Sequence, residues 1–504
     1  MTDPVPSPME PMAPGYRRNM LTLTAIFVST MAALDLTIVS VALPYMAGSL
    51  DAGGGEISWA MTMFTIGQAI IIGITGFLSR LLGRKRLALL AVGGFVISSA
   101  LCGLAQDLDQ LVLFRFVQGL FSGPLIPISQ SILVGAYPKE QRTHVLSLWV
   151  IGVMGGPAVG PALGGYLAQT LGWRSVFWVN LPIGVLALVL ILGFVRPVPA
   201  RRETTDYRGL LLLILWIVSL QILLDKGNEL DWLDSREIVF LGITAVTFAL
   251  AFFLRGALIG PRNIIDLYLL RDRNFTACAL LVAILGSLLL ALLILTPLLV
   301  IDVYRWEIVT AGMVIGGFGV LGLAGGVLAP HLASRIGVRP ALTIGCLFLA
   351  LGWHIYSRID LDSGPVQIFL AGALAEFGLM ICYPVLAAQA FANLRPDQHD
   401  EGAGLFNFMK TLGFSFGVTF VEVLLYRGNQ SNWNAYAGFI SVANPGLDGY
   451  LAGTGLEPTS ESAGALLAAQ LLRQTSMLSI VQCAEVMSVL ALLSIPLVLM
   501  LRTK

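Results

Sequence analysis

Long apolar runs recur along this chain, and each is about as long as a helix that crosses a lipid bilayer. Because an α-helix rises about 1.5 Å per residue, roughly 20 apolar residues cover the ~30 Å hydrocarbon core. Only 12% of the residues are charged, against about 25% in a soluble domain. The runs predict an all-α polytopic membrane protein with fourteen transmembrane helices, at residues 20–43, 57–78, 87–105, 112–134, 145–170, 177–195, 209–225, 237–255, 275–300, 308–331, 341–357, 366–391, 402–426 and 478–501.

The distribution of Lys and Arg predicts the orientation of these helices. With both termini in the cytoplasm, 21 of the 30 basic residues fall in cytoplasmic segments and seven in outer loops. Only Arg115 and Lys410 then lie within spans. Cytoplasmic loops of membrane proteins are enriched in Lys and Arg, so this threefold bias favours fourteen spans with both termini inside.

Composition also excludes several kinds of function. The net charge is zero, so no basic surface for nucleic acid is expected. The five cysteines stand singly in apolar runs and the four histidines form no cluster, so we predict no metal site. A phosphate-binding loop and a catalytic triad are both missing from the sequence, so we expect neither a cofactor nor an enzyme.

One apolar run has glycines at every fourth position, so that a helix there carries a stripe of bare backbone along one face. Prolines within the same run remove internal hydrogen bonds and bend the axis. A bare, bent helix suits close packing against a partner that later slides, although such a stripe also serves as a packing face in other polytopic proteins. The residues concerned are Gly152, Gly156, Pro157, Gly160, Pro161, Gly164 and Gly165.

A faint internal repeat predicts the domain organisation. The string GFLSRLLGRK after the second span resembles PHLASRIGVR after the tenth, with Leu, Gly and basic residues in register. Any cytoplasmic turn is rich in Gly and Arg, but the shared register favours two related halves. We predict a cytoplasmic tail at 1–19, six-helix bundles at 20–195 and 273–504, and two inserted helices with their loops at 196–272. A long outer loop is expected at about 427–476, and its end, with Leu467, Leu471 and Leu478 at helical spacing, predicts an amphipathic helix.

Several strings resemble motifs of the fourteen-span drug/proton antiporters of the major facilitator superfamily. LDLTIVSVALP is similar to the first-helix motif of that family, GFLSRLLGRKR to motif A and LVLFRFVQGLFSGPLIPISQS to motif B. GPAVGPALGGY is similar to motif C, and LQILLDKGNELDWLDSREI and NFMKTLGFSFG extend the resemblance along the chain. GPLIPISQS and LLDKGNELDW most resemble the EmrB-type multidrug efflux transporters.

The resemblance implies a major facilitator fold of two six-helix bundles plus two inserted helices. It implies proton-coupled efflux of amphipathic drugs or toxic molecules across the inner membrane by alternating access, within a tripartite pump. A periplasmic adaptor and an outer-membrane channel are then the expected partners, besides the bilayer. The alternatives are a dedicated exporter of one metabolite or siderophore, an uptake symporter, and a receptor or scaffold that no longer transports.

Ionisable residues at membrane depth are costly, so each one needs a reason. Asp35 lies deep in the first run, where loss of water favours its neutral form, and it is the candidate proton carrier. A structural hydrogen-bond acceptor is the alternative. The resemblance assigns Arg115 to proton transfer through a buried carboxylate, while a snorkelling interfacial cation explains it equally well. Gln118 lies one turn further and extends a polar patch.

The second half carries further candidates. Glu376, Glu422 and Glu485 lie in the twelfth, thirteenth and fourteenth spans and are candidates for proton coupling. Asn407 and Lys410 share one helix face and, with Thr37 and Gln118, are candidates for a substrate cavity or a buried polar contact. A structural ion pair between Lys410 and Glu376 is an equally good account.

Motif A predicts a cytoplasmic gate that includes Gly76, Arg80, Gly83 and Arg84. The general motif has an acidic residue where this chain has Arg80, and that acid helps to hold the gate closed. Arg80 cannot replace it, so locking of the gate by this pair is in doubt. EmrB-like chains also tend to lack the acid, which agrees with the assigned subgroup.

Overall fold

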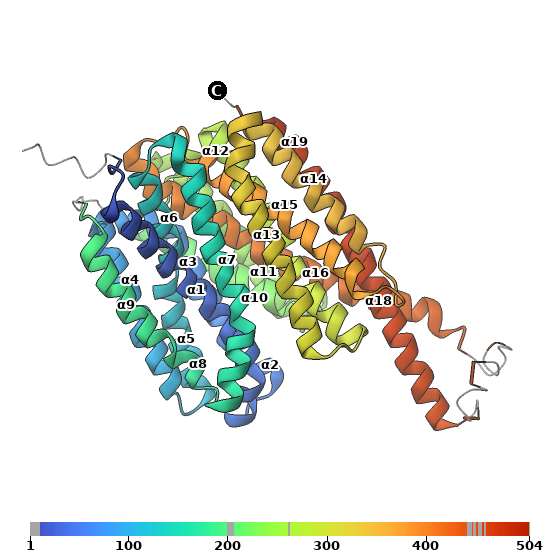
Figure 1. The fold of residues 1–504 in the computed structure, drawn as a ribbon. Coiled ribbons are helices and arrows are strands. Elements are labelled where there is room, and N and C mark those ends of the chain that lie inside the picture. The colour runs from blue at the N-terminus through green and yellow to red at the C-terminus, as the bar shows by residue number, and fades with distance from the viewer. Residues whose placement is uncertain are drawn as a thin grey trace, which may run out of the picture.

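The computed structural model describes residues 11–198, 206–260, 263–440 and 460–502, with residues 446, 450–451 and 456–457 between the last two ranges. All regular secondary structure in these residues is helical, and fourteen helical segments are long and apolar enough to cross a membrane (Figure 1). The predicted all-α architecture with fourteen spans is therefore confirmed.

The first six spans are α1 (Tyr16–Ser49), α3 (Trp59–Leu82), α4 (Arg84–Leu104), α5 with α6 (Leu108–Ser122, Leu125–Ala136), α7 (Lys139–Thr170) and α8 with α9 (Ser175–Trp178, Asn180–Phe194). The two inserted spans are α10 (Tyr207–Lys226) and α11 (Arg236–Ile259). The last six are α12 (Arg273–Pro297), α13 (Ile308–Ile336), α14 (Val338–Tyr356), α15 (Pro365–Ala390), α16 (His399–Ala437) and α18 with α19 (Glu461–Leu493, Ile495–Leu499).

The helices begin and end where the local sequence requires it. Asp107 and Asp272 cap α5 and α12 by accepting hydrogen bonds from the backbone N–H groups three residues later. Gly83 separates α3 from α4 with φ +82°, and Gly337 separates α13 from α14 with φ +90°. Both values lie in the left-handed region that favours glycine. The two copies of the repeated string thus make the same backbone turn at the same position.

The helices before α10 pack mainly with one another, and so do those after α11. We call these groups the first bundle (α1–α9) and the second bundle (α12–α19). The inserted helices pair with each other, and α10 also contacts α3 and α16, one helix from each bundle. Burial raises the pKa of the Asp206 carboxyl at the start of α10, but hydrogen bonds from Arg255 and from the Gly209 N–H hold it below its usual range. This clasp ties α10 to α11.

Both ends of the described chain lie on one side of the molecule, which we call the terminal face (Figure 1). Here the Met12 N–H donates to the Ala136 carbonyl, and Arg339 donates to the Leu501 carbonyl at 2.6 Å. On the opposite, far face, α16 continues to Ala437 and α18 begins at Glu461.

The predicted outer segment at about 427–476 is helical at both ends, since α16 continues to Ala437 and α18 begins at Glu461. The apolar pattern that suggested an amphipathic helix extends directly into the last span, so the two form one helix. The predicted helix from Glu461 is present, with Leu467 and Leu471 buried.

Candidate functional site

Asp35 lies at the centre of a buried polar network in the first bundle. Asp35 on α1 and Arg115 on α5 are both 0% exposed, and Arg115 Nη1 donates to Asp35 Oδ2 at 2.9 Å. Gln118 Nε2 donates to Asp35 Oδ1 at 3.0 Å and accepts from Arg115 Nη1 at 2.8 Å. Arg115 is thus a fully buried partner of Asp35, and interfacial snorkelling is ruled out for this conformation.

Asn180, at the start of α9, completes the carboxylate's surroundings. Its Nδ2 donates to Asp35 Oδ1 at 2.6 Å and to Ser99 Oγ at 3.1 Å. The Arg115 guanidinium carbon lies 4.2 Å from the centre of the Phe64 ring, a cation–π contact that offsets part of its lost hydration. Sequence patterns did not predict a role for Asn180. The signal that was available is an amide at the start of an apolar span.

The glycine stripe of α7 packs against α1 beside this network. A Cβ at Gly156 would lie 2.9 Å from the Leu34 backbone nitrogen, and one at Gly164 would lie 2.6 Å from the Ile38 carbonyl oxygen. The Thr37 hydroxyl faces Gly160, so Thr37 belongs to this contact. The partner of the stripe is therefore a helix of the same bundle, and the contact fixes the height of Asp35. The side chain of Pro157 lies outside the described residues.

A second polar cluster joins the two bundles at the terminal face. Arg80, at the end of α3, pairs with Glu401 of α16, and Arg84 pairs with Asp400 at 2.7 Å. Asp400 also accepts hydrogen bonds from Ser79, at 2.6 Å, and from Ser131 of α6. We call these six residues the latch. The motif A position is therefore paired although it carries Arg80, with the charges reversed, since the acids come from the second bundle.

The motif A glycines give the latch its close approach. A Cβ at Gly76 would lie 2.5 Å from Glu401 Cα, so α3 and α16 touch through backbone at this level. Gly83 makes the turn that points Arg84 toward Asp400. Nearby, Asn407 Nδ2 donates to Gln130 Oε1 at 2.5 Å, which adds a further side-chain link between the bundles. Asn407 is thus an interbundle contact.

The remaining candidates in the second bundle are scattered. Glu376 and Lys410 are both half-buried, and the described chain contains no ion pair or hydrogen bond of either side chain. The alternative of an ion pair between them is therefore wrong for this conformation. Lys410 Nζ lies 5.6 Å from the Phe414 ring. Glu485 is exposed on α18, remote from the Asp35 network.

Glu422 contacts the inserted helices. Its side chain hydrogen-bonds to Asn228 and lies within electrostatic range of Asp225 at the end of α10. On the same side of α10, Gln221 accepts from Ser415 of α16 at 3.0 Å. On the other side, Lys226 donates to Ser58, beside α3, at 2.9 Å. The first inserted helix is therefore hydrogen-bonded to both bundles near the far face, and sequence patterns did not predict this link.

Comparisons with known proteins agree with this architecture. A family model described as Major Facilitator Superfamily matches residues 25–418. The multidrug export protein EmrB of Escherichia coli strain K12 is 31% identical over 473 residues, which cover 92% of this chain and 91% of the relative. The fatty acid resistance protein FarB of Neisseria gonorrhoeae is 33% identical over 438 residues, covering 86% and 85%.

A solved structure, that of the human organic anion transporter MFSD10, superposes with a TM-score of 0.60 at 14% identity, covering 96% of this chain and 100% of that one. At this identity the likeness concerns the fold alone. The sequence relatives and the family match extend over most of the chain. The chain therefore belongs to the Major Facilitator Superfamily, among its EmrB-type members.

Proposed function

We propose that this protein exports amphipathic drugs or other toxic small molecules across the inner membrane in exchange for protons, by alternating access. The observation that carries the proposal is the Asp35–Arg115 ion pair, which is 0% exposed on both sides. A buried pair of this kind often contributes no net stability compared with apolar residues. A chain that had become a receptor or scaffold would have little reason to keep it.

The network suits a proton switch. A proton on Asp35 cancels the negative charge that Arg115 faces, while Gln118 and Asn180 can still hydrogen-bond the neutral acid. The guanidinium then loses its counter-charge in a buried site, which favours a rearrangement of α5 against α1. An inward proton supplies about 2.3 kcal/mol per ~100 mV, before any pH gradient is added.

The latch supports alternating access. Two ion pairs and two serine hydrogen bonds close the terminal face, which the distribution of basic residues predicts to be cytoplasmic. In this conformation the proton would reach Asp35 from the far, periplasmic face. Opening toward the cytoplasm requires the latch to break, and this cost keeps the leak low when no substrate is bound.

The relatives support efflux, since their names describe a multidrug export protein and a fatty acid resistance protein. Glu376 and Lys410, whose side chains have no ion pair or hydrogen bond within the described chain, supply one charge of each sign in the second bundle. We assign both to the substrate cavity, where they would attract polar groups of otherwise apolar compounds. Uptake symport is disfavoured by the motif C glycines, which in this superfamily resemble those of antiporters.

We also propose a periplasmic adaptor as a partner. At the far face, α16 and α18 extend beyond the neighbouring helices (Figure 1). Tyr436 of α16 and Leu472 of α18 are exposed on this extension. Exposed apolar side chains on a protruding helical pair suit a protein contact. An outer-membrane channel would complete a tripartite pump.

Purified protein in liposomes with an imposed pH gradient tests the proposed transport. A panel of unrelated dyes and antibiotics is added, each in turn, on the side of the terminal face. Each exported compound should cause protons to leave the lumen of the liposomes. Release with a single metabolite or siderophore alone would favour the dedicated exporter instead. A panel with no response, from protein that melts cooperatively, would favour the scaffold.

A further inference from the structure

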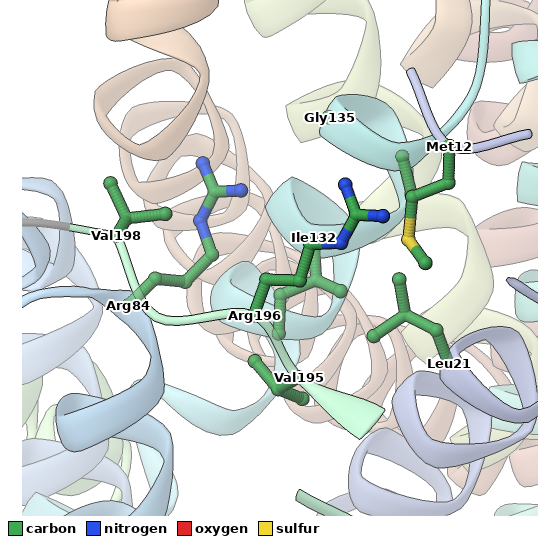
Figure 2. Close-up of a pocket in the computed structure, with 9 residues that line it drawn as sticks. Met12, Leu21, Arg84, Ile132, Gly135, Val195, Arg196 and Val198 are labelled. Atoms are coloured by element: carbon green, nitrogen blue, oxygen red, sulfur yellow. The ribbon is translucent and has the colours of Figure 1, made fainter. Parts of the chain in front are cut away.

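The terminal face carries a shallow pocket that touches the latch only through Arg84. It lies between the N-terminal segment, the start of α4, the end of α6 and the stretch that follows α9. Arg84 and Arg196 line it together with Met12, Leu21, Val195 and Val198 (Figure 2). The two guanidinium groups extend in the same direction in this view, and none of the lining residues is acidic.

The pocket carries more positive charge than the surrounding chain neutralises. Arg84 uses Nε and Nη2 for Asp400, while its Nη1 points toward Gly135 in the pocket wall. Arg196 is half-buried and has no hydrogen bond or ion pair within the described residues. Lys85 does not line the pocket but places a further cation beside the end of α9, where its Nζ donates to the Leu192 carbonyl at 2.7 Å. Such a cluster favours an anion.

An apolar track leads from the pocket along the outside of the molecule. Val185, Val189 and Leu192 are exposed on one face of α9, and Arg196 follows Leu192 by four residues. Tyr16, which is also exposed, packs edge-on against Phe194 at 6.0 Å between ring centres. Because α9 is a membrane span, its exposed apolar face lies against acyl chains. A tyrosine such as Tyr16, beside the last residues of α9, is typical of the membrane interface.

We propose that the pocket binds the phosphate group of an anionic phospholipid, with the acyl chains lying along α9. A phospholipid headgroup and free phosphate both offer a phosphate anion to the two arginines. The apolar track along α9 favours the lipid, because only the lipid has acyl chains to cover it. Basic pockets between transmembrane helices at a membrane surface are suited to anionic headgroups. Binding of the headgroup does not depend on the proposed transport.

The pocket and the latch share one guanidinium. A phosphate at Nη1 of Arg84 restrains the side chain in the orientation that keeps Nε and Nη2 on Asp400. Since a ligand stabilises the state that it binds, bound lipid favours the closed terminal face. This second part rests on the proposed function of the latch.

Native mass spectrometry of the purified full-length protein tests the binding. Phosphatidylglycerol and phosphatidylcholine are titrated separately, with inorganic phosphate as competitor. We expect phosphatidylglycerol to bind preferentially, and Arg196→Gln to weaken it roughly fivefold, as for the loss of one basic residue at an anionic surface. Arg196→Lys should retain most of the binding. Arg335→Gln is the matched control, because Arg335 is exposed at the same face on the second bundle.

Three results would overturn the inference. Equal loss in Arg196→Gln and Arg335→Gln would show general attraction between charges. Displacement of the lipid by an equal concentration of inorganic phosphate would show a free-anion site. Equal binding of both lipids would exclude selection by charge.

The link to the latch has its own measurement: phosphatidylglycerol should shorten the distance between spin labels at Gln141→Cys and Ser334→Cys in the wild-type background but not with Arg196→Gln. Intact binding without this shift would overturn the link alone.

Discussion

Neutralising Asp400 is expected to open the terminal face. Asp400 accepts from Arg84 Nε at 2.9 Å and Nη2 at 2.7 Å, and from Ser79 and Ser131 as well. Both charged side chains are about 15% exposed or less, and a hydrogen bond to a charged group is worth about 1.5–3 kcal/mol. Asp400→Asn keeps the shape and removes the charge, so we take about 2 kcal/mol as its cost. Since about 1.4 kcal/mol is a factor of ten, the ratio of open to closed molecules should rise roughly 30-fold.

Pulsed electron paramagnetic resonance measures the distance between spin labels at Gln141→Cys and Ser334→Cys, and the distance distribution reports the ratio of open to closed molecules. Both positions are exposed on the terminal face, one on each bundle, and all five native cysteines are buried. Asp397→Asn is the matched control, because Asp397 pairs with Arg395 at 3.7 Å in a largely exposed contact. Exposed pairs contribute about 0–1 kcal/mol, so its distance distribution should stay close to wild type. If Asp400→Asn and Asp397→Asn give the same distribution, the latch does not hold the face closed.

Other outcomes follow from single contacts. Gly156→Val should destabilise the protein by about 1–3 kcal/mol, because its Cβ meets the backbone of Leu34 at 2.9 Å, whereas Gly155→Val meets nothing within 4 Å; thermal unfolding in detergent compares the two, and equal melting temperatures would refute the close packing. Lys410→Met should raise the KM for exported compounds severalfold without lowering the melting temperature, since no ion pair within the described chain is lost; an unchanged KM would remove Lys410 from the cavity. Leu472→Asp should abolish crosslinking to a periplasmic adaptor in native membranes while leaving insertion intact, and unchanged crosslinking would exclude this surface.

The spans could be predicted because the bilayer imposes a length and a hydropathy that a single window of sequence reveals. The strings around Gly83 and Gly337 could also be matched to each other, because each is a short, local stretch of sequence. The outer end of α18 was predicted from its amphipathic spacing, whereas the continuation of α16 to Ala437 was not, because that part of α16 extends beyond the apolar run. Asp400 and Glu401 precede the apolar run that begins at residue 402, and charged residues in a loop are ordinarily solvated, so the sequence does not mark them as interbundle partners.

The site was only half visible. Asp35 and Arg115 stood out individually because charge at membrane depth is costly. Asp35 and Arg115 are 80 positions apart in the sequence, and Asp35 and Asn180 are 145 apart. In the latch, Arg84 and Asp400 are 316 positions apart. Contacts at such separations depend on how helices pack, and one sequence contains no record of that. The sequence therefore showed that Arg80 departs from motif A, but it did not show that Arg80 pairs with an acid of the second bundle.

Asp35 is proposed to couple proton entry to export, and transport by an Asp35 variant in inverted vesicles tests this coupling. Inverted vesicles that contain wild type, Asp35→Asn or Asp109→Asn are given a proton gradient, and compound accumulation and substrate-induced proton release are recorded from pH 6 to 8. Asp109 is exposed in the first turn of α5, so its substitution makes the same chemical change outside the network. We expect Asp109→Asn to behave as wild type, while Asp35→Asn inserts normally and shows neither accumulation nor release at any pH. Near wild-type export by Asp35→Asn would contradict the proposed coupling and make Asp35 a structural residue.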